Sequence, residues 1–109
     1  MGELDRTLIE ELKRRLPPEA ARHIRKMIMY GSRARGEATE DSDLDLVALV
    51  DVNTPDLERM LDEITYDVMW DHDFKPIISL KVFAEERFRQ AAAKGFSYYR
   101  NVEREGVPV

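Results

Sequence analysis

The sequence contains no cysteine, which excludes disulfide bonds and zinc–thiolate sites. It also has no apolar run as long as a signal peptide or a membrane span. Basic residues number 17 against 22 acidic ones, a net charge of -5, whereas binding to a phosphate backbone requires clustered Lys and Arg. We therefore expect a cytoplasmic protein that contacts neither a membrane nor nucleic acid directly.

The length of 109 residues suits one small hydrophobic core, so we expect a single domain over residues 1–109. Hydrophobic residues make up 43% of the chain and charged residues 36%, which is a globular composition. Segments of helical periodicity alternate with segments of strand periodicity. This alternation predicts an α/β (α+β) fold, a small mixed sheet with helices packed on it.

Helical patterns cover residues 4–16, 18–25, 54–70 and 84–94, and one or two further turns in the tail that begins at residue 96. The first of these ends at Pro17-Pro18, because proline interrupts helical hydrogen bonding. Thr54 is a typical N-cap for the third, and Gly95 closes the fourth. The end of the tail is predicted to be extended.

Strand patterns cover "KMIMYG" (26–31), "DLDLVALVD" (43–51) and "PIISLKVF" (76–83). In the second segment, both alternating faces become apolar after Asp45. A strand that is apolar on both faces belongs in the middle of a sheet. We therefore expect a central strand of which only the first residues, Asp43 and Asp45, are open to water.

Asp43 and Asp45 are two residues apart on one strand, so their side chains share a face with roughly 7 Å between the Cα atoms. Two ionised carboxylates at this spacing raise each other's proton affinity unless a cation lies between them. Oxygen ligands without His or Cys favour Mg²⁺, which often completes its shell with substrate phosphates. The pair therefore predicts a Mg²⁺ site beside a bound polyphosphate.

A turn follows the strand that precedes these acids. Gly31 lets the backbone bend sharply and approach a ligand closely. Ser32 is expected to cap a short helix and to donate its hydroxyl to a phosphate, and Arg33 and Arg35 add positive charge in the same turn. The turn is therefore predicted to bind phosphate.

Together, Gly31-Ser32 and Asp43-Leu44-Asp45 form the pattern G-S-x10-D-x-D. With "GSRARG" and the terminal "REGV", the chain resembles the minimal nucleotidyltransferases of the DNA polymerase beta-like superfamily, encoded beside HEPN-domain partners in toxin–antitoxin pairs. The resemblance implies an antitoxin that transfers AMP from ATP, with Mg²⁺, to a tyrosine of a HEPN partner. By position, Asp43 and Asp45 would hold the metal, and Gly31 and Ser32 the β- and γ-phosphates.

The resemblance is incomplete on the last predicted strand. Active family members carry a third carboxylate there, whereas this chain has Ser79 and Lys81 on the corresponding face. Asp71 and Asp73 precede the strand and are candidate replacements, while Lys81 is predicted to neutralise the leaving phosphates. Two functions therefore stay open: an adenylyltransferase, or a catalytically weak binding module that neutralises its partner by contact.

Overall fold

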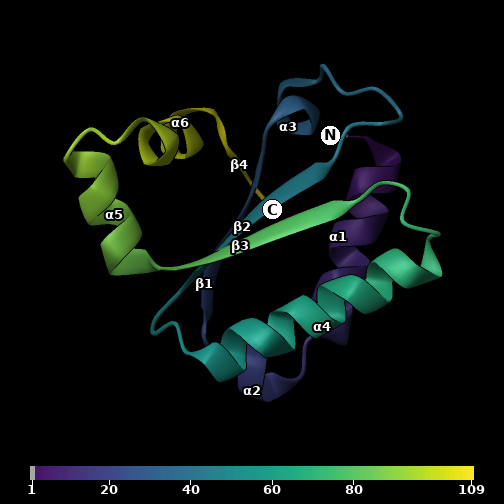
Figure 1. Ribbon diagram of the computed structural model, residues 1–109, viewed down its shortest axis with the longest axis horizontal. Coiled ribbons are helices and arrows are strands. Elements are labelled where there is room, and N and C mark those ends of the chain that lie inside the picture. The colour runs from purple at the N-terminus through teal and green to yellow at the C-terminus, as the bar shows by residue number, and fades with distance from the viewer. Residues whose placement is uncertain (1) are drawn as a thin grey trace.

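One sheet of four strands organises residues 2–109, which the computed structural model describes (Figure 1). The strands are β1 (Ile24–Tyr30), β2 (Leu44–Val50), β3 (Ile78–Ala84) and β4 (Val107–Pro108). The helices are α1 (Glu3–Arg15), α2 (Pro18–Ala21), α3 (Ser32–Arg35), α4 (Pro55–Asp71), α5 (Glu85–Ala93) and α6 (Ser97–Glu105). The sheet order is β3–β2–β1–β4, with β3 parallel to β2, and β1 antiparallel to both β2 and β4. The predicted mixed α/β fold is thus confirmed.

The strand β2 lies inside the sheet and is buried on both faces, as its sequence predicted. Leu46 and Ala48 belong to a core shared with α1 and α4, whereas Val47 and Leu49 pack with residues of α5 and α6. Helices therefore cover the two faces of the sheet (Figure 1). Among the described helices, none combines the length and the apolar character needed to cross a membrane.

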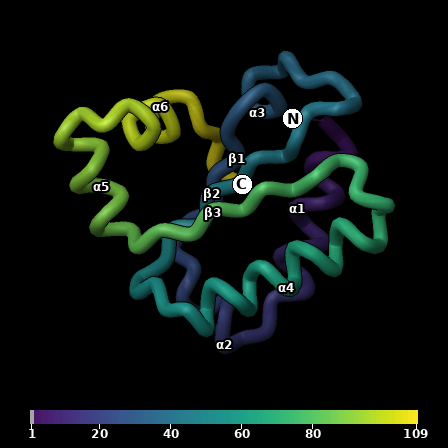
Figure 2. Tube along the Cα trace, in the orientation of Figure 1, coloured from purple at the N-terminus to yellow at the C-terminus, as the bar shows by residue number. Residues whose placement is uncertain are grey.

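The C-terminal segment forms a helix slightly longer than the one or two turns predicted, followed by the extended end that the sequence predicted. The helix α6 spans nine residues, and Val102 in it is only 1% exposed. It then continues into β4, where Val107 pairs with Met29 of β1, and Figure 2 shows this end of the chain beside β1. Val102 of α6 packs with Ile28 and Val47 of the sheet, which lie far from it in the sequence.

Several element boundaries differ from the prediction, most of all at the start of β1. The strand β1 begins at Ile24, not at residue 26, because Ile24 pairs with Val50 across an irregularity in the register. This earlier start limits the short second helix to residues 18–21. By contrast, the predicted cap of α4 is confirmed, since the Thr54 hydroxyl accepts a hydrogen bond of 3.1 Å from the Leu57 amide.

Phe88 of α5 is the aromatic centre of the second core. It is 2% exposed, and its ring centroid lies 5.4 Å from that of Phe83 and 5.2 Å from that of Tyr99. Phe88→Ala should therefore lower the free energy of unfolding by about 3–5 kcal/mol, measured in urea, because it leaves a cavity. Phe96→Ala is the control, since Phe96 is 59% exposed. Similar losses in the two variants would contradict the central place of Phe88.

Candidate active site

The ends of three strands bring the predicted site residues together. Asp45 is the second residue of β2, and it pairs with Tyr30 at the end of β1 and with Ser79 near the start of β3. Asp43 lies just before β2, because the strand begins at Leu44 and not, as predicted, at residue 43. Asp45 is half-buried and Asp43 is exposed, so two carboxylates stand where the sheet opens to water.

Gly31 touches Asp45 so closely that no other residue type fits without strain. Its φ of +86° lies in the region that glycine favours. A Cβ atom at this position would also lie only 2.7 Å from Oδ2 of Asp45. The predicted turn and the predicted metal ligand are therefore in direct contact.

Ser32 follows Gly31 but does not cap the helix, which corrects the prediction. The helix α3 begins at Ser32 itself, Gly31 takes the N-cap position, and no side chain makes a capping hydrogen bond. The physical reason is that a capping side chain must stand one residue before the first helical residue. The phosphate contact predicted for the Ser32 hydroxyl is a separate role and stays a prediction.

Arg33 is held by groups that the sequence did not connect with it. Its guanidinium pairs with Asp5 of α1, at 2.7 Å, and donates two hydrogen bonds to the carbonyl oxygen of Ser42. Both charged side chains are nearly buried, at 9% exposure for Arg33 and 5% for Asp5. Arg33 thus connects the loop before β2 to α1, and these contacts use three of the five N–H groups of its guanidinium, so the predicted phosphate contact stays a prediction.

A small cavity opens beside Asp45. It has a volume of about 130 Å³, and the polar side chains along its wall are Tyr30, Asp45, Ser79, Lys81 and Tyr98. Burial raises the pKa of the Asp45 carboxyl, as does the nearby charge of Asp43, and the charge of Lys81 partly offsets both effects. The site therefore disfavours an unaccompanied negative charge at Asp45 and suits a cation there.

The donor set fits one hard cation. Two carboxylates provide oxygen ligands of the kind that Mg²⁺ accepts together with water and phosphate oxygens. Neither candidate replacement adds to them: Asp71 accepts a hydrogen bond of 2.5 Å from Arg15 of α1, and Asp73 follows it in the loop after α4. Across residues 2–109, no three His, Cys, Asp or Glu side chains are grouped so as to hold a metal.

The sequence alone did not single out Tyr30, Tyr98 or Asp5. Tyr30 stands immediately before Gly31, on the same face of the sheet as Asp45, so strand alternation was a usable signal. The position of Tyr98 depends on how α6 folds back over the sheet. No local signal could have paired Asp5 with Arg33, because these residues are 28 positions apart.

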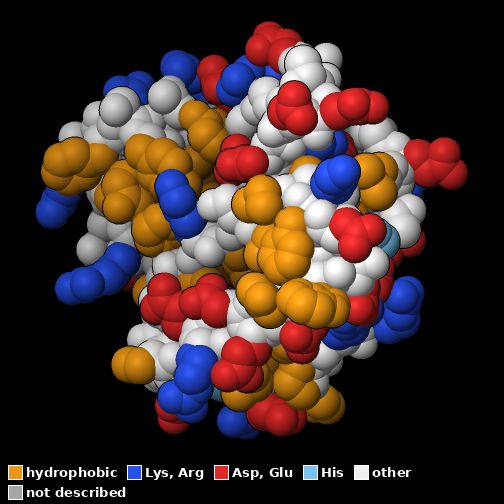
Figure 3. Space-filling view, turned by 45° about the vertical axis from the view of Figure 1, so that its right-hand side comes forward, with side chains coloured by type: hydrophobic (Ala, Val, Ile, Leu, Met, Phe, Trp, Pro, Cys, Tyr) orange, Lys and Arg blue, Asp and Glu red, His pale blue; other side chains and the backbone are white. Residues whose placement is uncertain are grey.

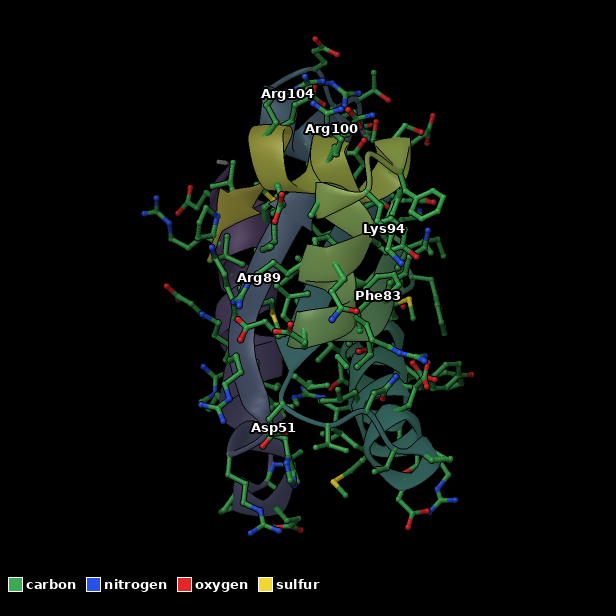
Figure 4. The ribbon with its side chains drawn as sticks, turned by 90° about the vertical axis from the view of Figure 1, so that its left-hand side faces the viewer. Asp51, Phe83, Arg89, Lys94, Arg100 and Arg104 are labelled. Carbon is green, nitrogen blue, oxygen red and sulfur yellow. The ribbon has the colours of Figure 1, made fainter. Side chains whose placement is uncertain are left out.

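A second group of charged side chains lies on the outer surface of α5 and α6 (Figure 4). Arg89, Arg100 and Arg104 line a groove of about 440 Å³ together with Glu103. Arg89 also approaches Glu85 and Glu86 of its own helix, at 3.6 and 3.7 Å. None of these residues lines the cavity beside Asp45, so we treat the groove as separate from the candidate active site.

Comparisons with known proteins identify relatives across nearly the whole chain. Residues 5–105 match the sequence model of a family described as the nucleotidyltransferase domain. The chain is also 33% identical, over 98 residues, to a protein of Methanocaldococcus jannaschii that is named "Putative protein adenylyltransferase". This alignment covers 90% of each of the two chains. Both matches therefore span the strands and the turn that carry the site.

The raised pKa of Asp45 makes a prediction about stability. A carboxyl whose pKa is higher in the folded state stabilises the fold at low pH, and this stability is lost as the pH rises through the folded-state value. At pH 7 without divalent ions, Asp45→Asn should therefore melt at a higher temperature than the wild type. The advantage should vanish below about pH 4, where an unperturbed Asp is also protonated.

Thermal unfolding followed by circular dichroism at pH 7 and pH 3.5 tests this difference. Asp62→Asn is the matched control, because Asp62 is an exposed carboxylate on α4. Equal shifts for the two variants would mean that ionised Asp45 does not destabilise the fold.

Proposed function

The chain belongs to the nucleotidyltransferase domain family, and from this premise we propose that it transfers AMP from ATP to a hydroxyl group of a partner protein, with Mg²⁺. The observation that carries the proposal is the contact of the Gly31 turn with Asp45, which lines a cavity and lies near the charge of Asp43. The name of the relative from Methanocaldococcus jannaschii supports a protein as the acceptor. The proposed partner is a HEPN-domain protein, and the proposed role is that of an antitoxin.

In this proposal, each part of the site binds one part of Mg-ATP. Asp43 and Asp45 hold the metal ion, which when bound would neutralise phosphate charge. The backbone at Gly31 and the hydroxyl of Ser32 hold the β- and γ-phosphates, and Lys81 faces the negative charge of the leaving group. Catalysis by such a site is mainly positioning and charge stabilisation.

The transfer makes one bond and breaks another. The hydroxyl oxygen of the acceptor bonds to the α-phosphorus of ATP, and the bond from that phosphorus to the oxygen bridging the β-phosphate breaks. Pyrophosphate leaves with the electron pair, and the hydroxyl proton passes to water. In-line geometry of the two oxygens about phosphorus is the usual requirement for this reaction.

The acceptor is proposed to be a tyrosine because the site provides no obvious protein base. Ser79 stands beside Asp45, where an acid would be placed to accept the proton. A general base usually contributes about 10²–10⁴ in rate. The phenol of tyrosine, with a pKa near 10, gives up its proton to water more readily than an alcohol does. A phenolic acceptor therefore suffers least from the missing carboxylate.

An aromatic surface formed by the end of α4 and the loop after it supports a protein partner. It consists of Tyr66, Trp70 and Phe74, whose ring centroids are 5.5–6.3 Å apart. Trp70 is 64% exposed and Tyr66 is 51% exposed. Figure 3 shows hydrophobic side chains gathered on this side of the molecule with acidic side chains around them. Exposed apolar patches with polar rims are typical of protein interaction sites.

A second candidate function is neutralisation of the partner by contact alone. Its supporting observation is that only two carboxylates meet at the site within residues 2–109. The two candidates differ in what they require. Contact alone predicts that Asp45→Asn, without ATP, still blocks the partner fully, whereas the transferase requires both the intact carboxylate and ATP.

Labelled ATP tests the transfer directly. When the protein is incubated with Mg²⁺, ATP labelled in the α-phosphate and its HEPN partner, the partner should acquire the label on tyrosine. Asp43→Asn should lower the rate of labelling about 100-fold or more, because a lost metal ligand removes several kcal/mol of charge stabilisation. Asp62→Asn should label at the wild-type rate, and equal rates for the Asp43 and Asp62 variants would contradict the metal-ligand role.

Two glycines provide a matched test of the phosphate turn. Gly31 and Gly36 both have positive φ, of +86° and +75°. Gly36 is in the left-handed helical region, where an alanine costs about 1–2 kcal/mol. Gly31, with a ψ of -159°, is in a region that is essentially restricted to glycine, where the strain is about 1–3 kcal/mol. Only at Gly31 does the new Cβ meet Asp45, whereas the space around Gly36 is open. Gly31→Ala should therefore weaken Mg-ATP binding in a calorimetric titration, and Gly36→Ala should not. Equal affinities would remove the turn from the nucleotide site.

A further inference from the structure

The position beside Asp45 on β3 adds no negative charge to the site. Ser79 occupies it, and neighbouring strands lie about 4.8 Å apart. Within the described chain, no third acid or imidazole joins Asp43 and Asp45. Two carboxylates and substrate phosphates are a sufficient shell for one Mg²⁺. A second ion, which would lie about 3.5–4 Å from the first, has no carboxylate of its own.

A positive charge already stands next to this position. Lys81 follows Ser79 by two residues, so its side chain leaves β3 on the same face. Lys81 lines the same cavity as Asp45 and Ser79. Its positive charge lowers the pKa of the Asp45 carboxyl, whereas burial raises that pKa. An ammonium group in the wall of this cavity would repel a second divalent cation there.

The ring of Tyr98 positions this ammonium group. The Nζ atom of Lys81 lies over the ring, 4.8 Å from its centroid, which is within the range of a cation–π interaction. The ring is itself fixed by edge contacts with Tyr30 and Tyr99, at centroid distances of 6.0 and 5.4 Å. Although Lys81 is an exposed residue, its charged end therefore has a defined partner at the cavity wall.

We propose that the site binds a single divalent ion per nucleotide, and that the ammonium group of Lys81, positioned by Tyr98, takes the place of a second ion. This inference rests on the proposed function, because it concerns the ion and the nucleotide of the same site. In this proposal, the Lys81 side chain provides the positive charge that a second metal ion from solution would otherwise provide. Lys81 thus acts on the charge of the phosphates, and Tyr98 is a positioning residue.

The number of bound ions tests the proposal without any turnover. Mn²⁺ serves as the probe, together with an ATP analogue whose α–β bridging oxygen is a methylene group, so that AMP cannot be transferred. Equilibrium dialysis should give one Mn²⁺ per bound nucleotide on the wild-type protein. The double variant Ser79→Asp/Lys81→Ala, which adds a carboxylate and removes the ammonium group, should give two.

Two Mn²⁺ per nucleotide on the wild type would overturn the inference and leave the proposed function intact. One Mn²⁺ on a double variant with a native circular dichroism spectrum would also overturn it. Failure of both Mn²⁺ and the analogue to bind would overturn the proposed function as well, so the two failures are distinguishable. The wild-type count decides the question even if the double variant does not fold.

Affinity for the same Mn²⁺–nucleotide complex tests the roles of the two side chains. Lys81→Ala should weaken binding about tenfold or more, as expected for a lost charge-assisted contact, and Lys81→Arg should restore most of it. Tyr98→Ala should weaken binding about two- to fivefold, the range of one cation–π interaction. Unchanged affinity in Lys81→Ala would overturn the inference. A lower melting temperature of Tyr98→Ala with unchanged affinity would remove Tyr98 from it.

Discussion

The contact between Gly31 and the Asp45 carboxylate is the constraint on which the site depends. It requires a residue without a side chain, with positive φ, at the point where β1 ends. It also requires β1 and β2 to pair in one register, because Tyr30 must lie opposite Asp45. A shift of that register by one residue would turn Asp45 to the other face of the sheet and bury it in the core under α1 and α4. The hydrophobic alternation of β2 therefore positions the acid as firmly as any contact within the site.

The two acids reduce the stability of this arrangement, and contacts elsewhere in the chain stabilise the loop that carries them. Burial and the neighbouring Asp43 raise the pKa of Asp45, so ionisation of this carboxyl opposes folding when no cation is present. The loop leading into β2 is meanwhile held by the nearly buried pair of Arg33 with Asp5, and by the hydrogen bonds of Arg33 to Ser42. Removal of either side chain of that pair would leave the other charge buried without a partner, which is strongly destabilising. The arginine next to the phosphate turn thus serves the architecture of the site.

What the sequence predicted well was encoded locally. Period-two alternation located the buried strand β2, and the Thr54 cap located the start of α4, because each depends on neighbouring residues. What it missed depended on contacts between distant segments. The start of β1 was set by pairing with Val50, and the bonds of Arg33 were set by α1. Within the site, spacing located the turn and the two acids, whereas the cavity wall contributed by Tyr98 required the folded position of α6.

The absence of a third carboxylate and the presence of Lys81 are best understood together. Had Ser79 alone replaced an acid, the site would have lost negative charge and with it part of its hold on cations. Lys81, which lies two residues further along the same face of β3, also makes the net charge of the site more positive. Positive charge attracts a triphosphate. The aromatic ring of Tyr98 gives that charge a fixed place, which an exposed lysine would otherwise lack. Two acids and one built-in cation therefore form a balanced set of charges, which is the arrangement that the proposed binding of one metal ion and one nucleotide requires.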